Sequence, residues 1–208
     1  MLVNSFLGSL TMVGTFITQA FDGLILFPSL LRVGPCPTVP VIKNFNTTAY
    51  LGRWYELERF ENLFQSGACA TADYSLFPNG SIEVVNTQIS NGNLDSLTGI
   101  AKPGPDPTVG DLIVSFPGPL SLLTQTPNYR IVTTDYTTRS VVYSCASFAG
   151  KRIEFAWILG REPYIPKAEL DVLKTELESY GIDTSRFMQM RQLNCPRRQL
   201  TKRRNLFP

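Results

Sequence analysis

The sequence predicts an all-β protein, an eight-stranded antiparallel up-and-down barrel with one C-terminal α-helix packed outside it. From Pro35 onward, short segments rich in β-branched and aromatic residues recur at fairly regular intervals, as is typical of strands. Turn-forming triplets separate these segments, and Pro78-Asn79-Gly80 and Asn91-Gly92-Asn93 are the clearest hairpin signals. One segment near the C-terminus has helical periodicity instead. These observations favour a closed barrel, which leaves no strand edge exposed.

The expected strands follow one another without an intervening helix. Their ranges are 53–60, 69–77, 81–90, 94–101, 109–116, 128–134, 139–146 and 152–160. Because alternate residues of a strand face opposite sides, one set in each strand should line the interior. Both sets are apolar in the last strand, as expected if its outer face contacts the helix. The small Ala156 marks that outer face.

The helix is expected to begin at Pro166, which suits a first turn, and to end before Gly181. Four residues recur on one face at helical spacing: Leu170, Leu173, Leu177 and Tyr180. The opposite face is mainly acidic. We therefore expect the helix to cover one side of the barrel and not to lie on a membrane surface, where a basic face is typical.

Composition excludes several classes of function. The chain has 19 Lys and Arg against 17 Asp and Glu, a net charge of +2, so it offers no broad field for nucleic acid or an acidic substrate. It contains no histidine, which excludes Ser-His and Cys-His catalysis and histidine metal sites. The four cysteines are too widely spaced for a zinc or iron-sulfur site. We expect no metal and no cofactor, and no feature specifies an oligomeric state.

The cysteines and two sequons indicate an oxidising compartment. Cys36, Cys69, Cys145 and Cys195 are expected to form two disulfides, and the sequence alone leaves three pairings open. Disulfides form and persist outside the reducing cytosol. The N-x-[ST] pattern at Asn46 and at Asn79 marks candidate N-glycosylation sites, which agree with such a compartment.

The chain is expected to divide into three parts. Residues 1–34 are largely apolar and are interpreted as a signal peptide that lacks a basic n-region, with a signal anchor or a misassigned start codon as the alternatives. Residues 35–196 form the barrel domain. Residues 197–208 form a basic tail, interpreted as solvated; contact with anionic lipid headgroups is the less favoured alternative.

Three motifs, in order along the chain, resemble the signatures of the lipocalins. Gly52-Arg53-Trp54 resembles the G-x-W motif at the first strand, and Thr134-Asp135-Tyr136 resembles the T-D-Y motif before the seventh. Arg161 resembles the motif arginine after the eighth strand. The resemblance covers roughly residues 35–196. Within the family, the stretches CPTVPVIKNFNTTAYLGRWYELERF, VVYSCASF and FAWILGREP are most similar to apolipoprotein D and to the insect lazarillo-type and bilin-binding lipocalins.

The resemblance implies structural roles for the motif residues. In lipocalins the tryptophan plugs the closed end of the barrel and the arginine lies across it. Trp54 and Arg161 are therefore expected to form a cation-π pair worth about 1 to 2 kcal/mol, while Gly52 lets the preceding turn pass closely beneath. The resemblance also implies the disulfide pairings Cys36 with Cys145 and Cys69 with Cys195.

A ligand pocket inside the barrel is a further implication of the resemblance. Trp157 and Tyr74 match a tryptophan and a tyrosine in the apolipoprotein D pocket, which binds small lipophiles. Around them we expect Asn86, Val114, Phe116 and Phe155, with the Asn86 amide and the Tyr74 hydroxyl orienting the ligand. No inward carboxylate or lysine is evident, which favours a neutral or weakly anchored ligand.

Three functions are compatible with such a barrel. The favoured one is a secreted, non-enzymatic carrier of a small hydrophobic ligand such as a sterol, fatty acid, retinoid or bilin. A lipocalin-scaffold isomerase would need a reactive pocket cysteine, whereas all four cysteines are expected in disulfides. A barrel filled by its own side chains could instead be a structural or interaction protein. The apolar loop 116–129 is a candidate for lipoprotein or membrane contact, with a lid over the ligand as the alternative.

Overall fold

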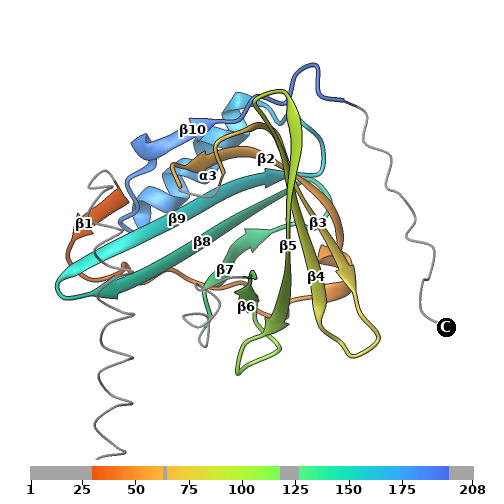
Figure 1. Ribbon diagram of the computed structural model, residues 1–208. Helices are drawn as coiled ribbons and strands as arrows, with labels where there is room; N and C mark the ends of the chain where they lie inside the picture. The colour runs from red at the N-terminus through yellow and green to blue at the C-terminus, as the bar shows by residue number, and fades with distance from the viewer. Residues whose placement is uncertain (1–29, 63–64, 118–126, 197–208) are drawn as a thin grey trace, which may run out of the picture.

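A computed structural model of the chain describes residues 30–62, 65–117 and 127–196 and shows a closed antiparallel barrel (Figure 1). Each barrel strand pairs with the next barrel strand along the chain, and the last barrel strand pairs with the first to close the barrel. The barrel strands are β2 (Gly52–Phe60), β3 (Ala68–Leu76), β4 (Ile82–Ser90), β5 (Asn93–Pro103), β6 (Asp111–Ser115), β7 (Tyr129–Thr134), β8 (Arg139–Phe148) and β9 (Lys151–Gly160). The predicted fold class is confirmed.

Some sequence-based expectations fall on residues outside these ranges. They are most of the expected signal segment, the apolar Leu120, Leu122 and Leu123 of the 116–129 loop, and the basic tail. Among the residues that are described, no helix is long and apolar enough to cross a membrane.

Short elements that the sequence analysis did not predict flank the barrel. Strand β1 (Leu31–Val33) pairs with β9 beside the projecting β8–β9 hairpin, and β10 (Phe187–Gln189) pairs with β2 (Figure 1). Helix α2 (Thr47–Tyr50) precedes β2, and the short helix η3 (Thr184–Arg186) precedes β10. Segments of three or four residues are too short to show a hydrophobic period.

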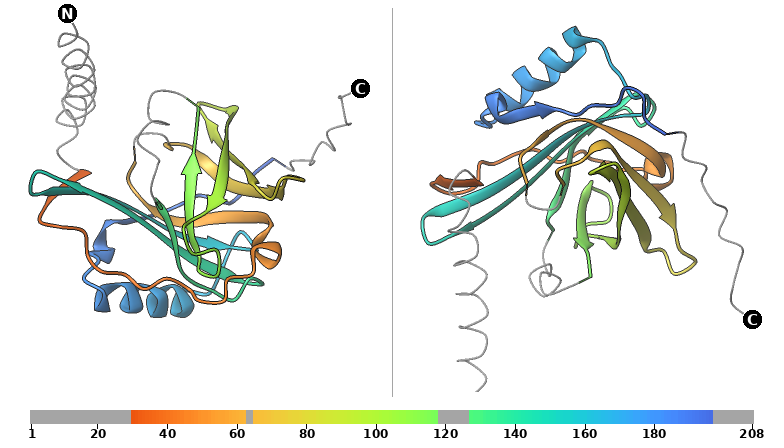
Figure 2. Two further views of the ribbon diagram at one scale, coloured as in Figure 1. Left: turned by 90° about the horizontal axis from the view of Figure 1, so that it is seen from below. Right: turned by 45° about the horizontal axis from the view of Figure 1, so that its top comes forward.

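Helix α3 (Lys167–Ser179) lies on the outside of the barrel (Figure 2). Its buried Leu173 and Leu177 belong to an outer apolar core with Ala156 and Ile158 of β9. A separate inner core fills much of the barrel around Trp54. Strand β9 is therefore covered on both faces, and the predicted position of Ala156 toward the helix is confirmed.

The two disulfides join segments outside the barrel to barrel strands. Cys36 pairs with Cys145 of β8, and Cys69 of β3 pairs with Cys195. These are the pairings that the resemblance implies. Near the second disulfide, the Gln192 side-chain amide donates to the carbonyl oxygens of Glu56 and Ala70, at 2.8 Å each. This amide bridges β2 and β3 beyond Tyr55, where their paired region ends.

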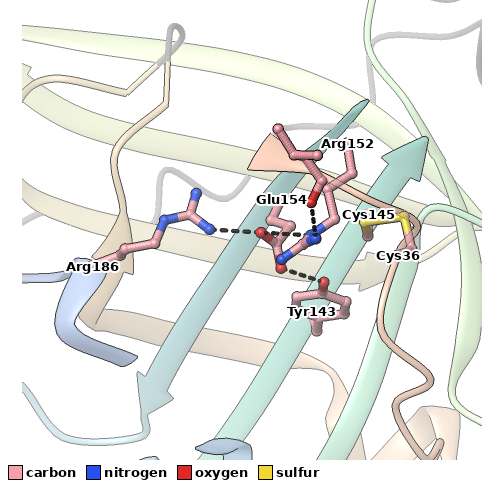
Figure 3. Close-up of a disulfide and its surroundings, with 7 residues drawn as sticks. Cys36, Tyr143, Cys145, Arg152, Glu154 and Arg186 are labelled. Carbon is pink, nitrogen blue, oxygen red and sulfur yellow. Dashed lines mark hydrogen bonds and ion pairs between the residues drawn. A yellow bond between two sulfur atoms is a disulfide. The ribbon is translucent and has the colours of Figure 1, made fainter. Parts of the chain in front are cut away.

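A buried carboxylate near the first disulfide connects several elements (Figure 3). Glu154 of β9 is 1% exposed and accepts a hydrogen bond of 2.8 Å from the Tyr143 hydroxyl of β8. Arg186 of η3 donates to the same carboxylate at 2.8 Å, and Arg152 forms an ion pair with it at 3.1 Å. Arg152 also donates to the carbonyl oxygen of Val33. This Glu154 cluster therefore holds the C-terminal segment and β1 against the barrel.

Candidate ligand-binding cavity

The closed end of the barrel is sealed by Trp54 and Arg161. Trp54 is fully buried, and the Arg161 guanidinium carbon lies 3.8 Å from the centre of its ring, in the expected cation-π arrangement. The indole N–H donates to the carbonyl oxygen of Tyr50 at 2.9 Å. Arg161 donates to the carbonyl oxygens of Tyr136, Arg53 and Ala49 at 2.9, 2.8 and 3.0 Å. One side chain thus joins α2, β2 and the β7–β8 turn.

Gly52 has a backbone conformation that this seal requires. Its φ is +92°, in the region that favours glycine. A Cβ at this position would lie 3.4 Å from Arg161 Nη1. A side chain at position 52 would therefore strain the backbone, although its Cβ would make only an ordinary contact with the arginine that covers Trp54.

The Thr134-Asp135-Tyr136 motif forms the turn between β7 and β8 at the closed end. The Asp135 carboxylate accepts hydrogen bonds from the backbone N–H groups of Thr137, Thr138 and Arg139, at 2.7 to 3.0 Å. Partial burial acts to raise the pKa of Asp135, but the hydrogen bonds from these residues outweigh it and lower the pKa to about 2. Asp135 therefore holds the backbone of this turn, and the Tyr136 carbonyl oxygen connects the turn to Arg161.

Replacing Asp135 with asparagine tests this turn through its pH dependence. A carboxylate whose folded-state pKa is depressed contributes stability above its unfolded pKa, 3.8, and loses the contribution as pH falls toward about 2. Asp135→Asn should therefore be less stable than the unmodified protein at pH 7, and the difference should shrink between pH 4 and pH 2. Thermal melts across this range measure it. A difference that does not change with pH would contradict the assignment.

Three tyrosines lie between Trp54, which plugs the closed end, and the rest of the barrel interior. Tyr50 lies on Trp54, with ring centres 5.1 Å apart, and Tyr74 contacts Tyr50 at 5.5 Å. The hydroxyl groups of Tyr74 and Tyr129 are 2.7 Å apart. Burial raises the pKa of Tyr50 to about 12 and raises those of Tyr74 and Tyr129 well above 10. The cluster is therefore neutral at physiological pH and separates the plug from the space above it.

A cavity of about 280 Å³ occupies the remaining part of the interior. All six residues expected to contact a ligand line it, and they come from four strands and the start of the β6–β7 connection: Tyr74, Asn86, Val114, Phe116, Phe155 and Trp157. Most of the other lining side chains are apolar or aromatic, as in pockets for small molecules. The barrel is therefore not filled by its own side chains.

The expectation that no carboxylate faces the interior is wrong. Glu56 lines the cavity and is 2% exposed. Strict alternation from the inward Trp54 places Glu56 on the same face, so the sequence did contain this signal. Beyond Glu56, the register of β2 against β9 shifts between Glu56 and Glu58, as at a β-bulge. Glu58 consequently faces outward and pairs with Lys174 of α3, with 2.6 Å between the charged atoms.

Glu56 belongs to a polar cluster, formed with Arg59 and Gln65, beside the cavity. Arg59 is 1% exposed and donates to Glu56 Oε2 at 2.9 Å and to the carbonyl oxygen of Gln65 at 2.7 Å. The Gln65 amide donates to Glu56 Oε1, and its oxygen accepts from the Trp157 indole N–H at 3.2 Å. Burial raises the pKa of Glu56, while the charge and hydrogen bond of Arg59 oppose that shift. The sequence analysis did not predict Arg59 or Gln65.

The chain matches the family described as Lipocalin-like domain over residues 45–192. This protein belongs to the lipocalin family. It is 41% identical to mouse apolipoprotein D over 167 residues, which cover 79% of this chain and 86% of the relative. It is 32% identical to the Lazarillo protein of Schistocerca americana over 183 residues, covering 85% and 83% of the two chains. Lipocalins of this kind bind small hydrophobic ligands in the barrel.

Solved structures show the same fold at lower identity. Lobster apocrustacyanin A1 superimposes on this lipocalin with a TM-score of 0.66 at 23% identity, covering 80% of this chain and 93% of the other. Insecticyanin of Manduca sexta gives a TM-score of 0.64 at 21% identity, covering 77% and 88%. At these identities the likeness shows the fold alone.

Proposed function

We propose that this lipocalin is a secreted, non-enzymatic carrier that binds one small hydrophobic ligand in the cavity of about 280 Å³. The observation that carries the proposal is that the six residues expected to contact a ligand all line one cavity. The closed end is sealed and hydrogen-bonded, so a ligand would enter from the opposite end. Burial of apolar ligand surface, at about 25 cal/mol per Å², would supply most of the affinity.

The cysteines support both the extracellular location and the absence of catalysis. All four form disulfides, so no thiol is left to act as a nucleophile in the cavity. Disulfides persist in oxidising compartments. The candidate glycosylation sites Asn46 and Asn79 are exposed at the closed end, before α2 and in the β3–β4 turn. Glycans there would leave the cavity entrance uncovered.

The two tryptophans provide a direct test of ligand binding. Trp157 lines the cavity, whereas Trp54 is fully buried below the tyrosines. A sterol, a fatty acid, a retinoid and a bilin are titrated separately into stripped, full-length protein from a eukaryotic host while tryptophan emission is recorded. We expect at least one class to change the emission saturably, and Trp157→Phe to lose most of the change because Trp54 does not border the cavity.

The result is checked independently by equilibrium dialysis of the same ligands. Trp157→Phe should keep its melting transition, which shows that the lost emission change is not a loss of folding. Protein that binds none of the four classes in dialysis would overturn the carrier proposal and favour an interaction protein instead.

A further inference from the structure

The described part of the cavity lining contains a single charged side chain. Among the lining residues that the structure describes, Glu56 is the one Asp or Glu, and there is no lysine or arginine. The tyrosines there are neutral at physiological pH, and burial raises their pKa values further above 10. A ligand in this cavity therefore meets one acidic group and no basic side chain.

The contacts of Glu56 favour its carboxylate form. Its two oxygens accept from two different donors, Arg59 at Oε2 and the Gln65 amide at Oε1. The charge and hydrogen bond of Arg59 favour the ionised form, against the burial that raises the pKa of Glu56. Each carboxylate oxygen can accept two hydrogen bonds, so Glu56 keeps acceptor capacity beyond the two bonds that hold it.

The positive charge that balances Glu56 is not available to a ligand. Arg59 is 1% exposed and does not line the cavity, and it directs Nη1 to Glu56 and Nη2 to the Gln65 carbonyl oxygen. The guanidinium therefore lies behind the carboxylate as seen from the cavity. An anionic group entering the cavity would approach Glu56 before it could approach Arg59.

Several donors around the cavity are already used within the protein, while the neutral Asn86 amide and Ser144 hydroxyl also line it. The Trp157 indole N–H donates to Gln65, and the hydroxyl groups of Tyr74 and Tyr129 share one hydrogen bond. The Asn128 amide donates to the Val114 carbonyl oxygen, while its own oxygen accepts from the Val114 N–H. The Trp157 indole could not serve a ligand carboxylate without losing its present partner. The remaining donors in the described lining are neutral, so none of them offsets the charge of Glu56, and a buried anion without a positive partner is costly.

We propose that the cavity selects neutral lipophiles carrying a hydroxyl or N–H donor, which bonds to Glu56, and that it discriminates against lipophiles with a carboxylate head. This inference rests on the proposed carrier function and narrows its ligand class. The preference arises because Glu56 borders the cavity, whereas Arg59 lies behind Glu56 and does not border it. Sterols with a free hydroxyl meet the requirement, whereas fatty acid anions do not.

The test compares three ligands with the same hydrocarbon chain, namely a primary alcohol, its methyl ester and the fatty acid anion. Their dissociation constants are measured at pH 8 by Trp157 emission and equilibrium dialysis, below their aggregation concentrations. A hydrogen bond to a charged acceptor corresponds to about a tenfold change in affinity or more. We expect the alcohol to bind about tenfold more tightly than the ester, and the anion to bind more weakly than both.

Two matched variants on β2 assign the preference to one carboxylate. Glu56→Gln keeps the shape of the side chain and removes its charge. The affinity for the alcohol divided by the affinity for the anion should therefore fall by about tenfold. Glu58→Gln removes an outward carboxylate two residues away, paired with Lys174, and should leave the ratio unchanged. A ratio that stays the same in a folded Glu56→Gln protein would overturn the role of Glu56.

The unmodified protein decides the question even if Glu56→Gln does not fold. An anion that binds as tightly as the alcohol would overturn the inference while leaving the carrier function intact. If none of the three ligands binds and the sterol, retinoid and bilin titrations also fail, the carrier function is overturned and the inference with it. The two failures are therefore distinguishable.

Discussion

Replacing Trp54 with alanine is expected to lower the free energy of unfolding by about 3 to 5 kcal/mol. The indole is fully buried at the closed end, between Tyr50 and Arg161. Its removal creates a void that the hydrogen-bonded backbone around it cannot easily fill. The Arg161 guanidinium also loses the aromatic face beneath it. Urea denaturation followed by circular dichroism measures the change.

Trp157→Ala is the matched control, because the chain has two tryptophans in different surroundings. Trp157 is partly buried and borders an existing cavity, so its removal enlarges a space instead of creating one. Its loss of stability should be clearly smaller than that of Trp54→Ala. Equal losses for the two variants would show that the closed end does not have the stabilising role assigned to it.

Replacing Glu154 with alanine is also expected to cost about 3 to 5 kcal/mol, because it breaks a buried ion pair by removing one partner. Arg186 and Arg152 would each lose the carboxylate they now contact, and the Tyr143 hydroxyl would lose its acceptor. The side chain is 1% exposed, so water cannot readily replace these contacts. We expect β10 and η3 to lose amide exchange protection before the barrel does.

Glu169→Ala provides the comparison at the surface. Glu169 of α3 pairs with Arg139 at 2.8 Å, and their side chains are 43% and 39% exposed. Exposed ion pairs contribute about 0 to 1 kcal/mol, so this variant should melt close to the unmodified protein. If Glu154→Ala lost as little stability as Glu169→Ala, the Glu154 cluster would not hold the C-terminal segment.

The sequence predicted the barrel well because its signals are repeated and local. Alternation and turn residues placed eight strands in the right order, with errors of a few residues at their ends, as for 109–116 against Asp111–Ser115. Alternation also placed Val114 and Phe116 on one face, and Phe155 and Trp157 on one face, while the resemblance to the lipocalins indicated that a ligand pocket lies there. The ordered motifs then identified which end is closed.

The polar side of the cavity was missed for physical reasons that differ by residue. Glu56 follows the alternation from Trp54, but it lies in the segment YELER, where charges on both faces hide the pattern. Arg59 faces inward because of the irregularity between Glu56 and Glu58, and no sequence period encodes such a shift. Gln65 reaches the interior from the connection between β2 and β3, whose path depends on tertiary contacts.

The order of the strands has a consequence for how the chain folds. Every ladder within the barrel joins strands adjacent in sequence, except the one between β2 and β9 that closes it. A hairpin between neighbouring strands loses little chain entropy because its loop is short. Closure of the barrel loses more, because it brings together the two ends of the meander. Trp54 lies on β2, and Arg161 directly follows β9. The cation-π pair therefore spans the one seam of the barrel that no local hairpin can form.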